Sequence, residues 1–165
     1  MITNFQKDLE RGRIAEGLVM DLFALLSKDY MFVDVASDRE CFHKGDILAI
    51  APDGREIYIE VKNDSRIADT GHILCEEEVF YYRDGLSVKG NMYNNTDIYV
   101  IVSEKDEVVY VIDFKVLQKN YKKGDFMVIP HAQQASYVYL LELCRIKQYG
   151  GLIATIDLKQ YRSEF

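Results

Sequence analysis

Residues 44–63 constrain the fold most, because they hold two short apolar runs on either side of a turn. The first run follows Asp46, the turn is Pro52-Asp53-Gly54, and the second run ends at Lys62. Pro and Gly between two such runs are typical of a turn that joins two strands. The pattern therefore predicts two paired strands, with Asp46 near the Glu60 end of the second one.

Three charged residues interrupt this otherwise apolar hairpin. Residues i and i+2 of a strand share a face, so Glu60 and Lys62 point the same way and Val61 points to the other side. Asp46 heads the first strand, so two carboxylates and one ammonium converge where core residues would ordinarily lie. This set is typical of a site that binds a divalent metal ion and attacks a phosphodiester. The plainer alternative is a wet strand face at a sheet edge, where Glu and Lys are common.

A further acid comes from a predicted helix over residues 4–28. Its apolar face is expected to contain Ile14, Leu18, Leu22, Leu25 and Leu26. At 100° per residue, Glu16 falls on the apolar side, beside Leu9, Met20 and Phe23. An acid in that position is costly without a partner. Glu16 is therefore a fourth candidate for the same cluster.

The remaining pattern favours an α/β fold with a mixed β-sheet flanked by helices. Strands are predicted over residues 31–35, 97–103, 108–112 and 152–158, and helices over 113–120 and 133–148, although Tyr137, Val138 and Tyr139 weaken the latter. Residues 75–82 are expected to be a short helix or a strand, and residues 85–95 a loop. We expect a single domain over 1–165, with a core of about 5–120 and a C-terminal extension of about 125–165.

Composition excludes several classes of protein. The chain has 165 residues, 48% of them hydrophobic, and two prolines, which is typical of a folded domain rather than a disordered one. No apolar run reaches the length of a membrane span, and the charged first residues do not resemble a signal peptide. The three cysteines have no metal-ligand spacing, which favours free thiols and a cytoplasmic location.

The net charge of −7 argues mildly against a nucleic-acid partner. Residues 31–103, which contain the predicted site, hold fourteen acidic and seven basic residues, so a bound cation would offset part of the excess. One basic cluster is a candidate DNA contact, with a solvated face as the alternative: Lys115, Lys119, Lys122 and Lys123. The acidic run over residues 76–78 offers candidate acidic ligands, although a charge run is usually a wet face. Asp34 and Glu40 lie close enough in sequence to join the site, but we expect a solvated loop there.

As a set, these residues resemble the active-site signature of the PD-(D/E)xK nuclease superfamily. The resemblance lies in Asp46 after Gly45, the thirteen-residue gap to Glu60, and the triplet Glu60-Val61-Lys62. The segment Arg11-Gly12-Arg13-Ile14-Ala15-Glu16 looks like the helix acid of archaeal Holliday junction resolvases and related exonucleases. The resemblance covers roughly residues 5–65, with the general α/β order up to about residue 120. Gly45 stands where the name of the motif has Pro.

The resemblance implies a restriction endonuclease-like fold and a Mg²⁺-dependent deoxyribonuclease, with Mn²⁺ as a substitute. Asp46 and Glu60 would hold the ion, the carbonyl of Val61 would add a ligand, and Glu16 would bind a second ion or a metal-bound water. Lys62 would stabilise charge or orient the attacking water, because a lysine among carboxylates should stay protonated. The substrate would be DNA, with RNA as a further possibility.

The sequence is also compatible with a protein of another class, one that binds but does not catalyse. The same fold without catalysis would serve as a DNA-binding or protein-interaction module. No separate DNA-recognition domain is visible, and a partner protein, or a homodimer that builds the groove from two subunits, would explain that lack.

Overall fold

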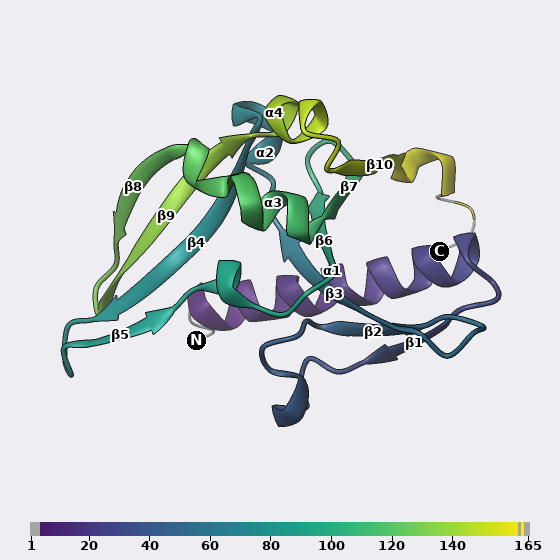
Figure 1. Cartoon of the computed structure of the whole chain (residues 1–165), viewed down its shortest axis with the longest axis horizontal. Helices are drawn as coiled ribbons and strands as arrows, with labels where there is room; N and C mark the ends of the chain where they lie inside the picture. The colour runs from purple at the N-terminus through teal and green to yellow at the C-terminus, as the bar shows by residue number, and fades with distance from the viewer. Residues whose placement is uncertain (1–3, 162, 164–165) are drawn as a thin grey trace.

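A mixed six-stranded sheet forms the centre of the computed structural model, which describes residues 4–161 and 163 (Figure 1). Its strand order is β1-β2-β3-β6-β7-β10. The neighbours β3 and β6 are parallel, and the other neighbouring strands are antiparallel. The strands are β1 (Met31–Asp34), β2 (Ile47–Ile50), β3 (Glu56–Asn63), β6 (Ile98–Ser103), β7 (Val108–Asp113) and β10 (Leu152–Asp157).

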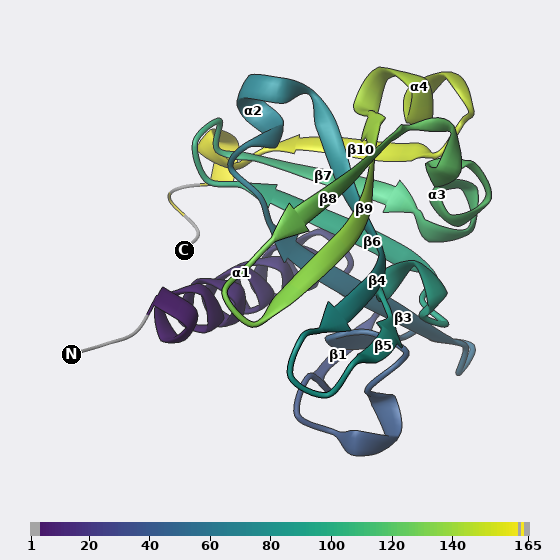
Figure 2. The same ribbon diagram turned by 90° about the vertical axis from the view of Figure 1, so that its left-hand side faces the viewer.

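A second, antiparallel sheet of four strands lies on one side of the first. Its order is β5-β4-β9-β8, and in Figure 2 β8 and β9 run across β6, β7 and β10. The strands are β4 (His72–Tyr81), β5 (Leu86–Lys89), β8 (Asp125–Pro130) and β9 (Gln134–Glu142). The sequence pattern predicted the mixed sheet correctly but did not predict this second sheet.

The helices flank the central sheet. They are α1 (Asn4–Leu26), α2 (Ile67–Thr70), α3 (Phe114–Asn120) and α4 (Leu143–Gln148), with short 3-10 helices η1 (Arg39–Cys41), η2 (Asn91–Tyr93), η3 (Tyr121–Lys123) and η4 (Leu158–Tyr161). None of the helices in the described part of the chain is long and apolar enough to cross a membrane. The α/β class with a mixed sheet flanked by helices is confirmed.

Two apolar clusters fill the two faces of the central sheet. One joins α1 to the face that carries Ile59 and Val61, and the other joins the opposite face to the second sheet and α3. Within α1, the buried stripe runs through Ala15, Val19 and Leu22. The predicted apolar face was therefore partly wrong, because Ile14 is 61% exposed.

Other local predictions have mixed outcomes. The hairpin β6–β7, the helix α3 and the last strand β10 are confirmed. The helix expected over residues 133–148 is wrong: its first part is β9 and only its end is α4, because Tyr137, Val138 and Tyr139 suit a pleated strand packed on both sides. Residues 85–95 include β5 and η2 rather than a plain loop, and β8 was not predicted.

The C-terminal residues contribute to both sheets. β10 pairs with β7 at the edge of the central sheet, and β9 pairs with β4 in the second sheet. Residues 125–161, expected to be an extension, therefore complete the layers that enclose the site.

Candidate active site

The candidate site lies where β2 and β3 separate. The two strands pair from Ile50 opposite Glu56 to Ile47 opposite Ile59. One residue further on, the amide of Asp46 still donates to the carbonyl of Ile59 at 2.8 Å. The Asp46 Oδ2 atom then accepts a hydrogen bond from the amide of Val61 at 2.8 Å. Its side chain thus takes the place of the next backbone partner and is fixed against β3.

The separation of β2 from β3 requires a glycine at position 45. Its φ is +150°, and a Cβ atom there would lie 2.6 Å from the carbonyl oxygen of Ile59. A side chain would have to push the backbone of β3 away, in a conformation that L-residues rarely adopt. The departure from the Pro of the motif name therefore has a structural reason in this chain.

Glu60 and Lys62 lie on the face of β3 opposite α1, as the alternation predicts. Glu60 stands beside Tyr99 in the register and is buried, with 8% of its surface exposed. The Lys62 Nζ atom lies 3.2 Å from Glu60 Oε1, and the lysine side chain is 45% exposed. The pair therefore joins a buried carboxylate to an ammonium that solvent still reaches.

Crowding of the acids changes their protonation. Burial, followed by the charges of Glu60 and Glu16, raises the pKa of Asp46 to about 7, although the Val61 amide and Lys62 act in the opposite direction. Burial lowers the pKa of Lys62, but Glu60, Asp46 and Glu76 outweigh it and the net shift is upward. The ammonium thus stays charged, while Asp46 titrates near neutral pH.

Glu16 reaches the same place from α1. It lines a hollow of about 360 Å³ together with Asp46, Val61 and Lys62. Burial and the nearby charge of Asp34 raise the pKa of Glu16, and Glu60 adds to the shift. Glu16 from α1, Asp46 before β2, and Glu60 and Lys62 of β3 therefore lie together, and we call the place where they meet the notch. Asp34 adds a negative charge from β1.

The donor chemistry of the notch fits Mg²⁺ with two carboxylates. Within residues 4–161 and 163, no group of three or more His, Cys, Asp or Glu is arranged to hold a metal ion. Mg²⁺ usually keeps several waters and binds through one or two carboxylates, so Asp46 and Glu60 are sufficient. The amide and carbonyl of one strand residue point to the same side, so the Val61 carbonyl faces the Asp46 side of β3, as its amide does. A direct bond from Glu16 to the same ion stays a prediction.

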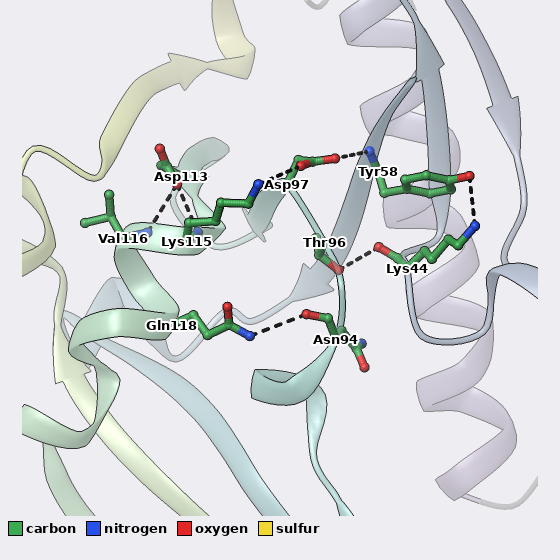
Figure 3. A network of polar contacts seen from close by, with 9 residues as sticks. All are labelled: Lys44, Tyr58, Asn94, Thr96, Asp97, Asp113, Lys115, Val116 and Gln118. Carbon is green, nitrogen blue, oxygen red and sulfur yellow. Dashed lines mark hydrogen bonds and ion pairs between the residues drawn. The ribbon is translucent and has the colours of Figure 1, made fainter. Parts of the chain in front are cut away.

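A network of polar contacts holds the loop that leads into Asp46 (Figure 3). Thr96, which is 2% exposed, donates from Oγ1 to the carbonyl of Lys44 at 2.6 Å. The amide of Asn95 donates to the carbonyl of His43 at 2.7 Å, and Asp97 Oδ2 accepts from the amide of Tyr58 at 2.9 Å. The segment before β6 therefore ties the Asp46 loop to β3, a role that no local sequence pattern indicates.

Glu76 lies beside the site, although the sequence pattern favoured a wet face for the acidic run that contains it. It lines one hollow with Asp46 and Glu60 and a second hollow with Lys62. The charge of Glu76 also helps to raise the pKa of Lys62. The amide of Glu76 donates to Asn91 Oδ1 at 3.1 Å. The prediction of a wet face was wrong here, because Glu76 is half-buried and lines both hollows beside the candidate site.

Glu77, its neighbour, also has partners instead of solvent. Its carboxylate pairs with Lys122 at 2.9 Å and accepts hydrogen bonds from Tyr93 and Tyr121. Adjacent residues of a strand ordinarily lie on opposite faces, and the β-bulge between Glu76 and Glu78 interrupts this alternation. Only the fold of the second sheet could show this.

The predicted basic cluster lies away from the notch, on α3 and η3. Lys115 lies 3.6 Å from Asp97, Lys122 pairs with Glu77, and Lys123 donates to Asn120 at 2.6 Å. Lys119 is exposed. The hollows beside Asp46 and Glu60 are lined by other residues.

Comparison with known proteins gives little beyond this geometry. No family model and no curated protein matches the sequence. Among solved structures, the chain is similar to a nuclease from a fusselovirus, with 7% sequence identity and a TM-score of 0.42, over 99% of this chain and 92% of that one. The functional conclusion therefore rests on the geometry of the notch.

Proposed function

We propose that this protein is a metal-dependent deoxyribonuclease of the PD-(D/E)xK type with a restriction endonuclease-like fold. The supporting observation is the carboxylate of Asp46, held on the amide of Val61 beside the Glu60–Lys62 ion pair. Glu16 from α1 completes the acidic set. Burial and, after it, the charges of Glu60 and Glu16 raise the pKa of Asp46, and a divalent cation would favour the charged carboxylate.

Each residue has a distinct part in the proposed reaction. Asp46 and Glu60, with the carbonyl of Val61, would hold Mg²⁺ or Mn²⁺. When bound, such an ion lowers the pKa of its water and neutralises charge on the phosphate. The Lys62 ammonium would stabilise the charge that develops on the phosphoryl oxygens, or orient the attacking water. Glu16 would accept a hydrogen bond from water on the α1 side of the notch.

Cleavage of DNA tests this proposal. The purified protein is incubated with Mg²⁺ or Mn²⁺ and linear duplex, circular duplex, single-stranded or branched DNA, and the products are separated on gels. We expect cleavage of at least one form, abolished by EDTA, by Asp46→Asn and by Lys62→Ala, while Lys147→Ala, at an exposed position of α4, keeps full activity. No cleavage of any form, or cleavage unchanged in both site variants, contradicts the proposal. RNA of matched length shows whether the sugar matters.

One observation keeps a non-catalytic module as the second candidate. No three candidate ligands are gathered at one point within the described residues, so metal affinity is the property on which the two functions differ. Titration with Mn²⁺ in a calorimeter separates them. A nuclease should bind the ion in a manner lost with Asp46→Asn and Glu60→Gln and retained with Glu78→Gln, whereas the module should bind none.

A further inference from the structure

A pocket next to the notch has the composition of a base-binding site. It has a volume of about 500 Å³, within the range of roughly 300–1,000 Å³ typical of small-ligand pockets. One wall is apolar and comes from the second sheet: Leu74, Met127, Ile129 and Leu140. The register places Leu74 opposite Leu140, and alternation along β8 puts Met127 and Ile129 on that same face.

Polar groups lie around this apolar wall. Arg66 and His72 line the pocket, together with Asp64 and Thr70. The Nδ1 atom of His72 lies 2.6 Å from the carbonyl oxygen of Thr70. Because a carbonyl oxygen can only accept a hydrogen bond, Nδ1 is the nitrogen that carries the proton. In the neutral imidazole, Nε2 is then an acceptor. An apolar slot with a guanidinium and a hydrogen-bond acceptor suits a nucleotide, with its flat base and its charged phosphate.

The pocket continues directly to the candidate active site. Asp64, Arg66 and Leu74 line both this pocket and the adjacent hollow that contains Lys62. A strand whose phosphodiester lies at Lys62 therefore has a neighbouring nucleotide within reach of Arg66. This continuity favours the substrate strand itself as the occupant, rather than an unrelated small molecule.

The charges around the notch favour contacts with bases over contacts with phosphates. The pocket and the three hollows around Asp46, Glu60 and Lys62 are lined by seven acids and four bases, namely Asp8, Glu16, Asp46, Glu60, Asp64, Glu76 and Glu104 against Arg11, Lys62, Arg66 and Lys89. Affinity for duplex DNA comes largely from basic side chains that neutralise its phosphates, and this surface has few basic side chains. Single strands gain affinity from contacts with their exposed bases.

We infer that the pocket between α2 and the second sheet receives an unpaired nucleobase of the substrate strand, adjacent to the phosphodiester at Lys62. The substrate class is therefore single-stranded or locally unpaired DNA. A paired base cannot enter an apolar slot without leaving its partner. This inference rests on the proposed nuclease function for the identity of the strand.

Binding measurements without cleavage test the inference. A fluorescein-labelled oligonucleotide of about twelve nucleotides is titrated with protein in EDTA, as a single strand and as a duplex. We expect the single strand to bind about tenfold or more tightly than the duplex, and one abasic position to weaken binding by about tenfold. Equal affinity for both forms, insensitivity to every abasic position, or no binding of the single strand overturns the inference.

A matched pair of variants locates the effect. Met127 and Val128 are adjacent in β8, 45% and 47% exposed, and on opposite faces of the sheet. Met127→Ala should weaken single-strand binding about fivefold, and Val128→Ala should leave it unchanged. Equal effects of the two variants contradict the assignment of the pocket. Cleavage in Mg²⁺ is measured separately, so a pocket without nuclease activity and a nuclease without this pocket give different results.

Discussion

Asp46 carries a cost in stability that its position predicts. Its pKa is raised from 3.8 to about 7, so the folded protein holds a proton that the unfolded chain releases at lower pH. Stability should therefore fall as the pH rises from about 4 to about 7, and the metal-free protein should be least stable above that range. Functional sites often hold such destabilising groups.

The variant Asp46→Asn tests this at the level of one side chain. Its amide oxygen keeps an acceptor for the Val61 amide but carries no charge, so it should raise the free energy of unfolding at pH 8 in EDTA by about 1–3 kcal/mol. At pH 5 the gain should shrink, because the wild-type carboxyl is then largely protonated. Urea denaturation at both pH values measures the difference. A loss of stability at pH 8 as large as at pH 5 contradicts the crowded-acid interpretation.

Gly45 is the other residue on which the notch depends. Gly45→Ala should destabilise the protein by about 2 kcal/mol or more, because it combines an unfavourable φ with a 2.6 Å contact to Ile59. Gly54→Ala is the control, since Gly54 also has a positive φ, of +84°, but no atom lies within 4 Å of its added Cβ. The two melting temperatures measure the contribution of the close contact. Equal losses would mean that backbone strain alone explains both.

Among the elements, the segment between η2 and β6 positions the site without lining its centre. Thr96→Val removes the donor to the Lys44 carbonyl while keeping a similar volume, and should cost about 1–3 kcal/mol. Metal affinity at Asp46 should fall as well, because the loop that carries it loosens. Thr155→Val, on an exposed position of β10, is the control. Denaturation together with Mn²⁺ titration gives both readouts, and unchanged values for Thr96→Val contradict the bracing role.

Sequence reasoning succeeded at this scale where local pattern and tertiary environment agree. The strands β2 and β3, the hairpin β6–β7 and the helix α3 all followed from periodicity and turns. It failed for β9, where tyrosines at the pleated positions outweighed a helix-like composition. It also failed for β5 and β8, two edge strands whose residues are almost all exposed.

The residues of the site likewise divide into those whose proximity the local pattern predicts and those that only the tertiary fold brings in. Asp46, Glu60 and Lys62 lie in one hairpin, so their proximity could be predicted from strand alternation. Glu16 was found from its helical angle, although the buried stripe of α1 differs from the predicted face. Glu76 could not be singled out from its two acidic neighbours, because its position depends on the pairing of β4 with β9 in a second sheet that the sequence pattern did not predict.

At the scale of the whole molecule, the acidic surroundings of the notch predict how binding depends on salt. With few cations near the site, the slope of log K against log [salt] for single-stranded DNA should be shallow, about −1 to −2. Anisotropy titrations at several salt concentrations measure it. A slope several times steeper would place most of the binding on a basic surface such as the one formed by Lys119 and its neighbours.

The layers also explain why the site lies where it does. The α1 helix covers one face of β3 and the second sheet covers the other, and Asp46 lies at the end where β2 stops and β3 continues. Two hollows of the described residues reach Asp46, one lined with Glu16 of α1 and one lined with Glu76 of the second sheet. The two apolar clusters thus stabilise the fold and place the acids of α1, β3 and β4 near one another.

The rate of metal-dependent cleavage tests the central claim most directly. With Mg²⁺ in excess, wild-type protein and Lys62→Ala are compared on single-stranded and duplex DNA, with Lys147→Ala as the control. Loss of the Lys62 charge should lower the cleavage rate by about 100-fold or more, and the control should cleave at the wild-type rate. If the wild-type protein cleaves neither DNA, or if Lys62→Ala cleaves as fast as the control, the notch is not a nuclease active site.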